Sequence, residues 1–136
     1  MAEKAIHNGS AWEKFRQLVI AQGGDIRTLD NTDRFPLAQT QEVVKSPQGG
    51  YLSLVHARMI GEAAVLLGAG RTKKSDPIDH AVGIVVHHKV GDKVEKGMPL
   101  FTLHANGQKQ LDEAREMALS SYRWQDQPAK PLPLFY

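Results

Sequence analysis

The stretch KVGDKVEKGMPLFTL, from Lys89 to Leu103, decides the fold of this chain. Gly91-Asp92 and Gly97 interrupt it at a spacing that predicts two tight turns, because such turns require the backbone conformations that glycine adopts. A single apolar face remains for the core, made by Val94, Leu100 and Leu103. The stretch therefore predicts a short strand held between two turns and a second strand that follows them.

The residues around this stretch predict further strands and helices. Two short runs, 42–47 and 51–56, flank a glycine turn and predict two strands, and a third strand is expected at Val82–His88. Apolar residues recur at helical spacing from Met59 to Leu67 and from Leu111 to Tyr122. Because these elements follow one another without regular βαβ units, the sequence predicts an α+β fold with a mostly antiparallel sheet.

The two ends of the chain have patterns of their own. Ser10 and Glu13 have the spacing of a capping box, so a helix is predicted to begin at Ser10 and to end at Gly23-Gly24. Residues 25–40 are polar, have no sustained period and are predicted to be a linker. A lone capped helix followed by a linker is typical of the end of a preceding domain. The three prolines of Gln127–Tyr136 predict an edge strand or an extended tail.

Composition excludes several classes of protein. The net charge is only +2 and the two signs are interspersed, which argues against a nucleic-acid partner. The chain has no cysteine, so disulfides, thiolate zinc sites and cysteine nucleophiles are excluded. No apolar run approaches the roughly 20 residues of a membrane span, so no membrane partner is expected. A reduced, cytoplasmic location is predicted from the absence of cysteine and of an apolar signal-peptide region near Met1.

The glycine-rich segment GAGRTKKS, Gly68 to Ser75, invites comparison with phosphate-binding loops. It lacks the glycine-lysine pair at P-loop spacing, and Lys73 stands where a dinucleotide fingerprint needs its third glycine. The segment also follows a helix, and a helix C-terminus carries partial negative charge, which favours cations over phosphate. Arg71, Lys73 and Lys74 are therefore interpreted first as a complement to that helix end.

Histidines and acidic residues offer two further candidate sites. Four histidines fall in one region: His80, His87, His88 and His104. Neighbouring residues of a strand point to opposite faces, so His87 and His88 cannot easily share a metal ion. The acidic residues of this region, Asp76, Asp79, Asp92 and Glu95, stand in turn-rich polar segments where such residues are expected. We therefore predict neither a metal centre nor an acid–base pair.

The turn pattern resembles that of biotinyl and lipoyl-like carrier domains, and the segment Val43–Leu52 resembles their first half. A carrier needs a lysine at an exposed hairpin tip, beside methionines for biotin or after aspartate for lipoate. The candidate at the right distance is Lys109, which has Gln108 and Gln110 as neighbours. A free-standing carrier and an independent protein-interaction module remain the alternative interpretations.

Four blocks together resemble the C-terminal region of pyrimidine-nucleoside and thymidine phosphorylases. They are SAWEKFRQLVIAQGGD (10–25), VVKSPQGGY (43–51), IGEAAVLLGAGRTKKSDPIDHAVGIVV (60–86) and HKVGDKVEKGMPLFTLHAN (88–106). The blocks cover nearly the whole chain in the family's order and spacing. The chain departs from the family at His56-Ala57-Arg58, where acidic residues are expected, and this affects a local surface contact.

The resemblance implies a parent enzyme that cleaves pyrimidine nucleosides with inorganic phosphate as co-substrate, without an organic cofactor. Such enzymes are homodimers, with an α domain that binds nucleoside and an α/β domain that binds phosphate. By this resemblance, residues 1–29 are the last helix of the α/β domain and a linker. Residues 30–136 are then the C-terminal domain, an α/β-hammerhead on a barrel-sandwich core. The family's catalytic residues lie in the first half of its polypeptide, so this chain alone is predicted to be inactive.

One loop remains as a candidate functional segment. The charged stretch from Arg71 to Asp79 is bracketed by glycines, as a mobile loop would be. It is predicted to lie near the interdomain cleft of the parent enzyme and to become ordered when the cleft closes. The residues assigned to it are Arg71, Lys73, Lys74, Asp76 and Asp79.

Overall fold

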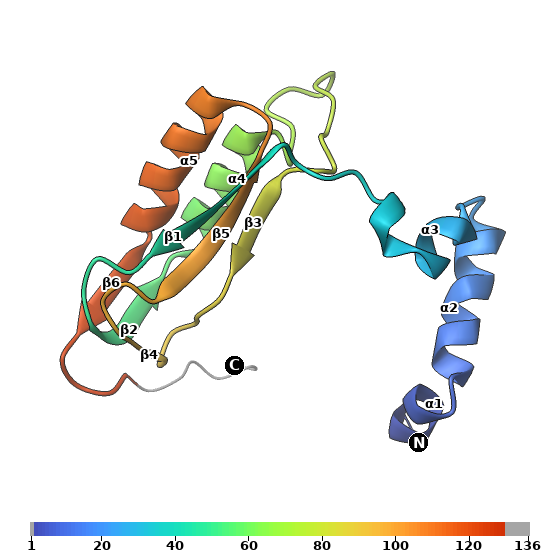
Figure 1. Cartoon of the computed structure of the whole chain (residues 1–136), viewed down its shortest axis with the longest axis horizontal. Helices are drawn as coiled ribbons and strands as arrows, with labels where there is room; N and C mark the ends of the chain where they lie inside the picture. The colour runs from blue at the N-terminus through green and yellow to red at the C-terminus, as the bar shows by residue number, and fades with distance from the viewer. Residues whose placement is uncertain (1, 130–136) are drawn as a thin grey trace. The chain divides into compact units, whose positions relative to one another are not determined.

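The computed structural model describes residues 2–129 and divides the chain into two units, Met1–Pro36 and Leu37–Tyr136 (Figure 1). None of the helices in residues 2–129 combines the length and the apolar character that crossing a bilayer requires. Residues 130–136, which belong to the predicted C-terminal tail, lie outside the described residues.

The first unit is built from short helices. Its elements are α1 (Ala2–His7), α2 (Ser10–Ala21), α3 (Ile26–Asp30) and the 3₁₀ turn η1 (Thr32–Arg34). Helix α2 confirms the predicted helix, but the predicted capping box is wrong. Gly9 is the N-cap and Ser10 already lies in the helix. The chain enters α2 from another helix, and the Asn8 side chain accepts a hydrogen bond from the Ser10 amide at 3.0 Å.

The segment predicted to be only a linker also contains helical turns. The Asp25 carboxylate accepts a hydrogen bond from the Arg27 amide at 2.9 Å, and the Asn31 side chain accepts one from the Asp33 amide at 3.0 Å. These caps begin α3 and η1 without any apolar period. Hydrophobic patterning cannot detect such short polar turns, because it depends on a repeated apolar face.

The second unit contains two three-stranded antiparallel sheets and two helices. One sheet has the order β1 (Thr40–Lys45), β5 (Pro99–Ala105), β3 (Gly83–Val86), and the other β4 (Lys93–Val94), β2 (Gly50–Val55), β6 (Tyr122–Gln125). Helices α4 (Ala57–Leu67) and α5 (Gln108–Ser120) lie side by side along the strands (Figure 1). The predicted α+β class with antiparallel strands is confirmed, and the barrel-sandwich core stays a prediction.

The stretch from Lys89 to Leu103 folds as its pattern predicts. Gly91 and Gly97 have φ angles of 97° and 86°, which favour glycine, and they form the turns on either side of β4. The apolar face of the stretch is almost completely buried: Val94 is 1% exposed, and Leu100 and Leu103 are 0% exposed. These side chains therefore form the centre of the core.

The end of α5 corrects one prediction. Tyr122 continues the helical spacing of the residues before it, yet α5 ends at Ser120 and Tyr122 begins β6. Its ring is 1% exposed and stacks on Phe101 with 5.7 Å between the ring centroids. Burial raises the pKa of Tyr122 to about 12. An aromatic residue four positions after Ala118 suits the helix face and a buried strand equally, so spacing alone could not locate the boundary.

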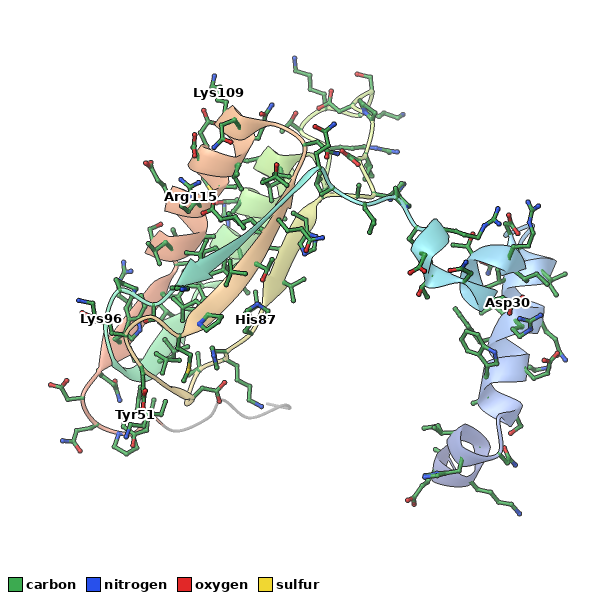
Figure 2. All side chains as sticks on the ribbon, viewed as in Figure 1. Asp30, Tyr51, His87, Lys96, Lys109 and Arg115 are labelled. Carbon is green, nitrogen blue, oxygen red and sulfur yellow. The ribbon has the colours of Figure 1, made fainter. Side chains whose placement is uncertain are left out.

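A half-buried ion pair holds α5 against the first strand. Arg115 donates to the two carboxylate oxygens of Glu42 on β1, at 2.5 and 2.7 Å, and Figure 2 shows where Arg115 lies. This carboxylate is the main reason that the pKa of Arg115 is raised. The bidentate geometry fixes the orientation of α5 and with it the position of the turn before that helix.

Candidate functional site

The loop between α4 and β3 is closed at its base by backbone contacts. Gly68 is the C-cap of α4, and its carbonyl accepts a hydrogen bond from the Asp79 amide at 3.0 Å. The ten residues between these two positions therefore leave and return to the same place on the domain.

Asp79 also joins the loop to two distant parts of the chain. Its carboxylate accepts hydrogen bonds from the Ala81 amide at 2.9 Å and from the Asn106 side-chain amide at 2.7 Å. The Asn106 side-chain oxygen in turn accepts from the Gln39 amide at 2.8 Å. These contacts connect the loop base, the end of β5 and the entry to β1, so the base of the loop is held on three sides.

The tip of the loop is folded around Asp76. This carboxylate accepts hydrogen bonds from the Thr72 amide at 3.2 Å, the Thr72 hydroxyl at 2.5 Å and the Lys73 amide at 2.8 Å. The Thr72 hydroxyl bond, followed by the Lys73 amide bond, keeps the pKa of Asp76 below its ordinary value. The tip is therefore a defined turn, although all its hydrogen bonds are local.

Three cations project from this turn. The side chains of Arg71, Lys73 and Lys74 are exposed, and within residues 2–129 none of them forms an ion pair. Beneath the loop lies an open hollow of about 370 Å³, lined by Leu67, Gly68, Pro77, Ile78, Asp79, Asn106, Gly107 and Gln110. The five residues assigned to the loop thus separate into a cationic tip, an internal brace at Asp76 and an anchor at Asp79.

Sequence reasoning did not assign a role to Asn106 or Gln39. Asn106 lies 27 residues after Asp79, and Gln39 lies 67 residues before Asn106. Asn106 stands directly after a strand and before a helix, where a side-chain amide commonly bonds to nearby backbone. That local signal identifies a capping candidate, but only the fold shows that its partner is Asp79.

The Asp79 anchor predicts a dependence of stability on acid. Its hydrogen bond from Ala81 and then that from Asn106 lower its pKa from the ordinary value of 3.8. A lowered pKa in the folded state contributes stability above about pH 4, and this contribution is lost as pH falls through the folded value. We therefore expect Asp79→Asn to be less stable than the parent chain at pH 7 and to lose less stability between about pH 4 and pH 2.

Urea unfolding at several pH values measures this effect. Glu116→Gln is the matched control, because the Glu116 side chain is exposed and forms no hydrogen bond or ion pair within residues 2–129. If the free energy of unfolding falls equally with pH below pH 4 in the Asp79→Asn variant and in the parent chain, Asp79 is not the anchor of the loop.

The histidines are placed separately. No group of three or more potential histidine or carboxylate ligands comes together within residues 2–129. A ring nitrogen of His87, labelled in Figure 2, lies 2.8 Å from the Thr102 hydroxyl, and His88 lies 3.6 Å from Asp92. These partners give both side chains local structural roles.

Lys109 does not occupy the position of a carrier lysine. It lies in the first turn of α5, as Figure 2 shows, and its ammonium group is 3.8 Å from the Glu113 carboxylate one helical turn further on. A carrier presents its lysine at the tip of a hairpin, so the structure does not favour the carrier interpretation.

Comparison with known proteins gives one consistent result. Residues 51–125 match the family model described as pyrimidine nucleoside phosphorylase C-terminal domain. The chain is 44% identical over 114 residues to pyrimidine-nucleoside phosphorylases from Staphylococcus aureus strains USA300, COL and bovine RF122 / ET3-1. The matched region covers 84% of this chain and 26% of each relative, so the chain spans about a quarter of their length.

Proposed function

Because the chain belongs to the family of pyrimidine nucleoside phosphorylase C-terminal domains, we propose that it serves a phosphorolytic enzyme as a scaffold. The parent enzyme uses inorganic phosphate to cleave a pyrimidine nucleoside into free base and (deoxy)ribose 1-phosphate. It works as a cytoplasmic homodimer without an organic cofactor. The bond-breaking groups belong to its nucleoside-binding and phosphate-binding domains.

The use of the carboxylates in the loop carries this proposal. Both oxygens of Asp79 accept hydrogen bonds from the chain itself, and Asp76 accepts three. The pKa of each carboxyl is lowered by these donors. A general base works best with a pKa near the operating pH. These two groups are therefore suited to holding the loop and poorly suited to proton transfer.

The cationic tip is the part of the loop that serves the parent enzyme. We place Arg71, Lys73 and Lys74 at the edge of the cleft between the two substrate-binding domains, where phosphate enters. Cations at the edge of a cleft raise the local concentration of an anionic substrate. The fixed base at Asp79 would let the tip change conformation on closure without disturbing the domain beneath it.

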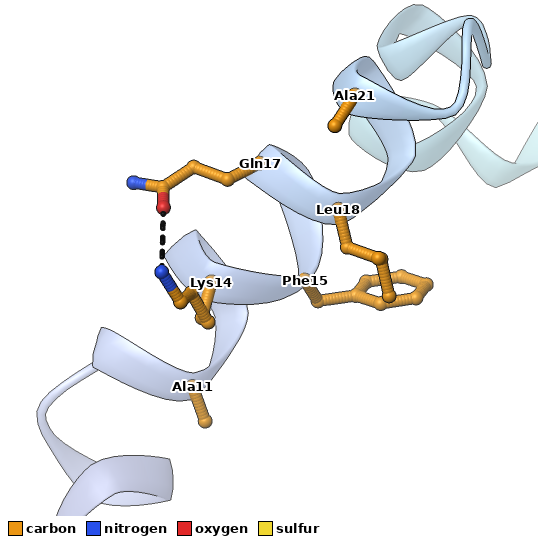
Figure 3. Close-up of a pocket in the computed structure, with 6 residues that line it drawn as sticks. All are labelled: Ala11, Lys14, Phe15, Gln17, Leu18 and Ala21. Atoms are coloured by element: carbon orange, nitrogen blue, oxygen red, sulfur yellow. Dashed lines mark hydrogen bonds between the residues drawn. The ribbon is translucent and has the colours of Figure 1, made fainter.

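Helix α2 supports a division of the chain between two domains of the parent. None of its residues is buried. Its apolar stripe, made by Trp12, Phe15 and Leu18, is therefore uncovered, with these side chains between 44% and 52% exposed. Phe15 and Leu18, drawn as sticks in Figure 3, are among the residues that line an apolar hollow of about 600 Å³. A helix of 12 residues is marginal in water without packing. We propose that residues 1–29 complete the phosphate-binding domain, which covers this stripe.

The scaffold role predicts that the isolated chain does not turn over nucleoside. When the chain is incubated with phosphate and thymidine or uridine, we expect free base to be released no faster than in the same mixture without the chain. The reason is that the contacts that position the substrates are missing. Chromatography of the base is the measurement, and a full-length phosphorylase of this family is the positive control. Base release that rises with the concentration of the isolated chain would refute the scaffold role.

The position of the tip predicts a kinetic effect in a full-length enzyme that carries this domain. We expect Arg71→Ala to lower kcat/KM for phosphate about tenfold while leaving the melting temperature unchanged, because Arg71 is exposed. Lys96→Ala, on the turn between β4 and β5, is the matched control for the loss of one exposed cation. Equal kinetics for Arg71→Ala and Lys96→Ala would place the loop away from the cleft.

A further inference from the structure

The dipeptide Asn-Gly occurs twice in the chain, as Asn8-Gly9 and as Asn106-Gly107. Asparagine is a thermolabile residue, because the backbone nitrogen that follows it can attack its side-chain amide carbon. Glycine favours this attack, since it has no Cβ atom to hinder the approach of its own nitrogen. Both asparagines are exposed, so water reaches them. The same reactive pair therefore stands at two places in the fold.

The two asparagines differ in how their side chains are held. The Asn106 side-chain nitrogen donates to Asp79 at 2.7 Å, and its oxygen accepts from the Gln39 amide at 2.8 Å. Within residues 2–129 the Asn8 side chain has one hydrogen bond, which its oxygen accepts from the Ser10 amide at 3.0 Å. Reaction requires the two atoms to come within about 3–3.5 Å in a suitable orientation. Asn106, held at both ends, should reach this geometry only when its hydrogen bonds open.

We propose that Asn106-Gly107 is a deamidation site that releases the anchor of the loop. The Gly107 nitrogen, which donates no hydrogen bond within residues 2–129, loses its proton to hydroxide and attacks the side-chain carbon of Asn106. The bond from that carbon to the side-chain nitrogen breaks, and the nitrogen takes a proton from water and leaves as ammonia. A cyclic imide remains, and water opens it to aspartate or isoaspartate. The sequence is redox-neutral and uses only water and hydroxide.

The reaction removes the donor that holds Asp79. Asn106 is the side-chain link between Asp79 and Gln39, and the product carries a carboxylate in place of the amide. This carboxylate cannot donate to Asp79 and repels it, because both groups are negative above about pH 4. Isoaspartate also lengthens the backbone between β5 and α5. Either product therefore loosens the base of the loop, and the loss of ammonia makes the change irreversible. The proposal does not depend on phosphorolysis.

Peptide mapping by mass spectrometry, after incubation of the full chain in mildly alkaline buffer, tests the site. We expect both asparagines to convert, with Asn106 about tenfold slower than Asn8 because its two hydrogen bonds must open first. Asp79→Ala should raise the rate at Asn106 about tenfold and leave the rate at Asn8 unchanged. Asn106 that is intact in both chains after Asn8 has converted, or that converts at the same rate in both, would overturn the proposal.

A second variant tests the chemistry without removing a hydrogen bond of Asn106. A Cβ atom on Gly107 would crowd only the side-chain end of Gln110, which can turn away, and the Gly107 φ angle of −139° suits any residue. Gly107→Ala should therefore fold normally and slow conversion at Asn106 about tenfold, because its Cβ atom hinders the attack. Asn8, in the same chain, is the control and should convert at the parent rate. An unchanged rate at Asn106 would rule out attack by the Gly107 nitrogen.

Brief digestion with trypsin measures the release of the loop, because proteolysis follows the opening of a segment. Molecules with converted Asn106 should be cut after Arg71, Lys73 or Lys74 about fivefold faster than unconverted molecules, since one hydrogen bond to a charged group is lost. Asn106→Asp should show the same faster cutting from the start. Cutting after Lys96, an exposed cation between β4 and β5, is the control and should not change. Equal cutting of the loop before and after conversion would refute its release.

Discussion

Replacing Phe101 with alanine is expected to lower the free energy of unfolding of the Leu37–Tyr136 unit by about 3–5 kcal/mol. Phe101 is 0% exposed and lies on β5, the central strand of its sheet. Its ring stacks on Tyr122, which belongs to the other sheet. The substitution would remove this stacked contact between the two sheets and leave a cavity in the core. Since small domains are stable by only about 5–15 kcal/mol, a large share of the stability would be lost.

Urea denaturation followed by circular dichroism measures this effect. Val85→Ala is the control within the same unit, because it truncates an apolar side chain on β3 that is 50% exposed. Surface substitutions of this kind usually change stability by less than about 0.5 kcal/mol. Equal unfolding midpoints for Phe101→Ala and Val85→Ala would mean that the two sheets do not share one core.

The core could be predicted from sequence because its signals are local. Gly91, Gly97 and Val94 lie within seven residues of one another, and their order alone specifies a turn, a short buried strand and a second turn. Strand β6 was missed because its first residue, Tyr122, also fits the preceding helical period. At that point two kinds of structure compete for one apolar residue, and only packing against Phe101 decides between them.

The candidate site was predictable only in part, because the contacts that anchor it join residues far apart in the sequence. The loop from Arg71 to Asp79 is visible in sequence as a charged segment between glycines. Its anchoring is not visible, because Asp79 bonds to Asn106 and through it to Gln39, which is 67 residues from Asn106. No spacing rule links residues so far apart, and the contact exists only because β1 pairs with β5 in the register that places Thr40 opposite Ala105. The sequence therefore identified the segment that projects, and the fold identified what holds it.

The adjacent glycines Gly49 and Gly50 provide the sharpest contrast between sequence and structure. As sequence they are one turn signal, and nothing distinguishes them. In the structure Gly50 has a φ angle of 142°, and a Cβ atom on it would lie 2.9 Å from the Gln125 backbone oxygen of β6. We expect Gly50→Ala to lower the free energy of unfolding by at least about 2 kcal/mol, because it strains the backbone and pushes β6 away from β2.

Gly49→Ala is the matched control for this prediction. A Cβ atom on Gly49 would come no closer than 3.6 Å to any atom, which is an ordinary contact, and its φ angle is not positive. Its alanine variant should therefore unfold within about 0.5 kcal/mol of the parent chain, with a small gain where alanine restricts the unfolded state. Urea unfolding of the two variants distinguishes strain and crowding at Gly50 from a destabilising effect of any side chain in this turn. If both variants lose the same stability, the turn as a whole needs glycine and the close approach of β6 to Gly50 does not set the requirement.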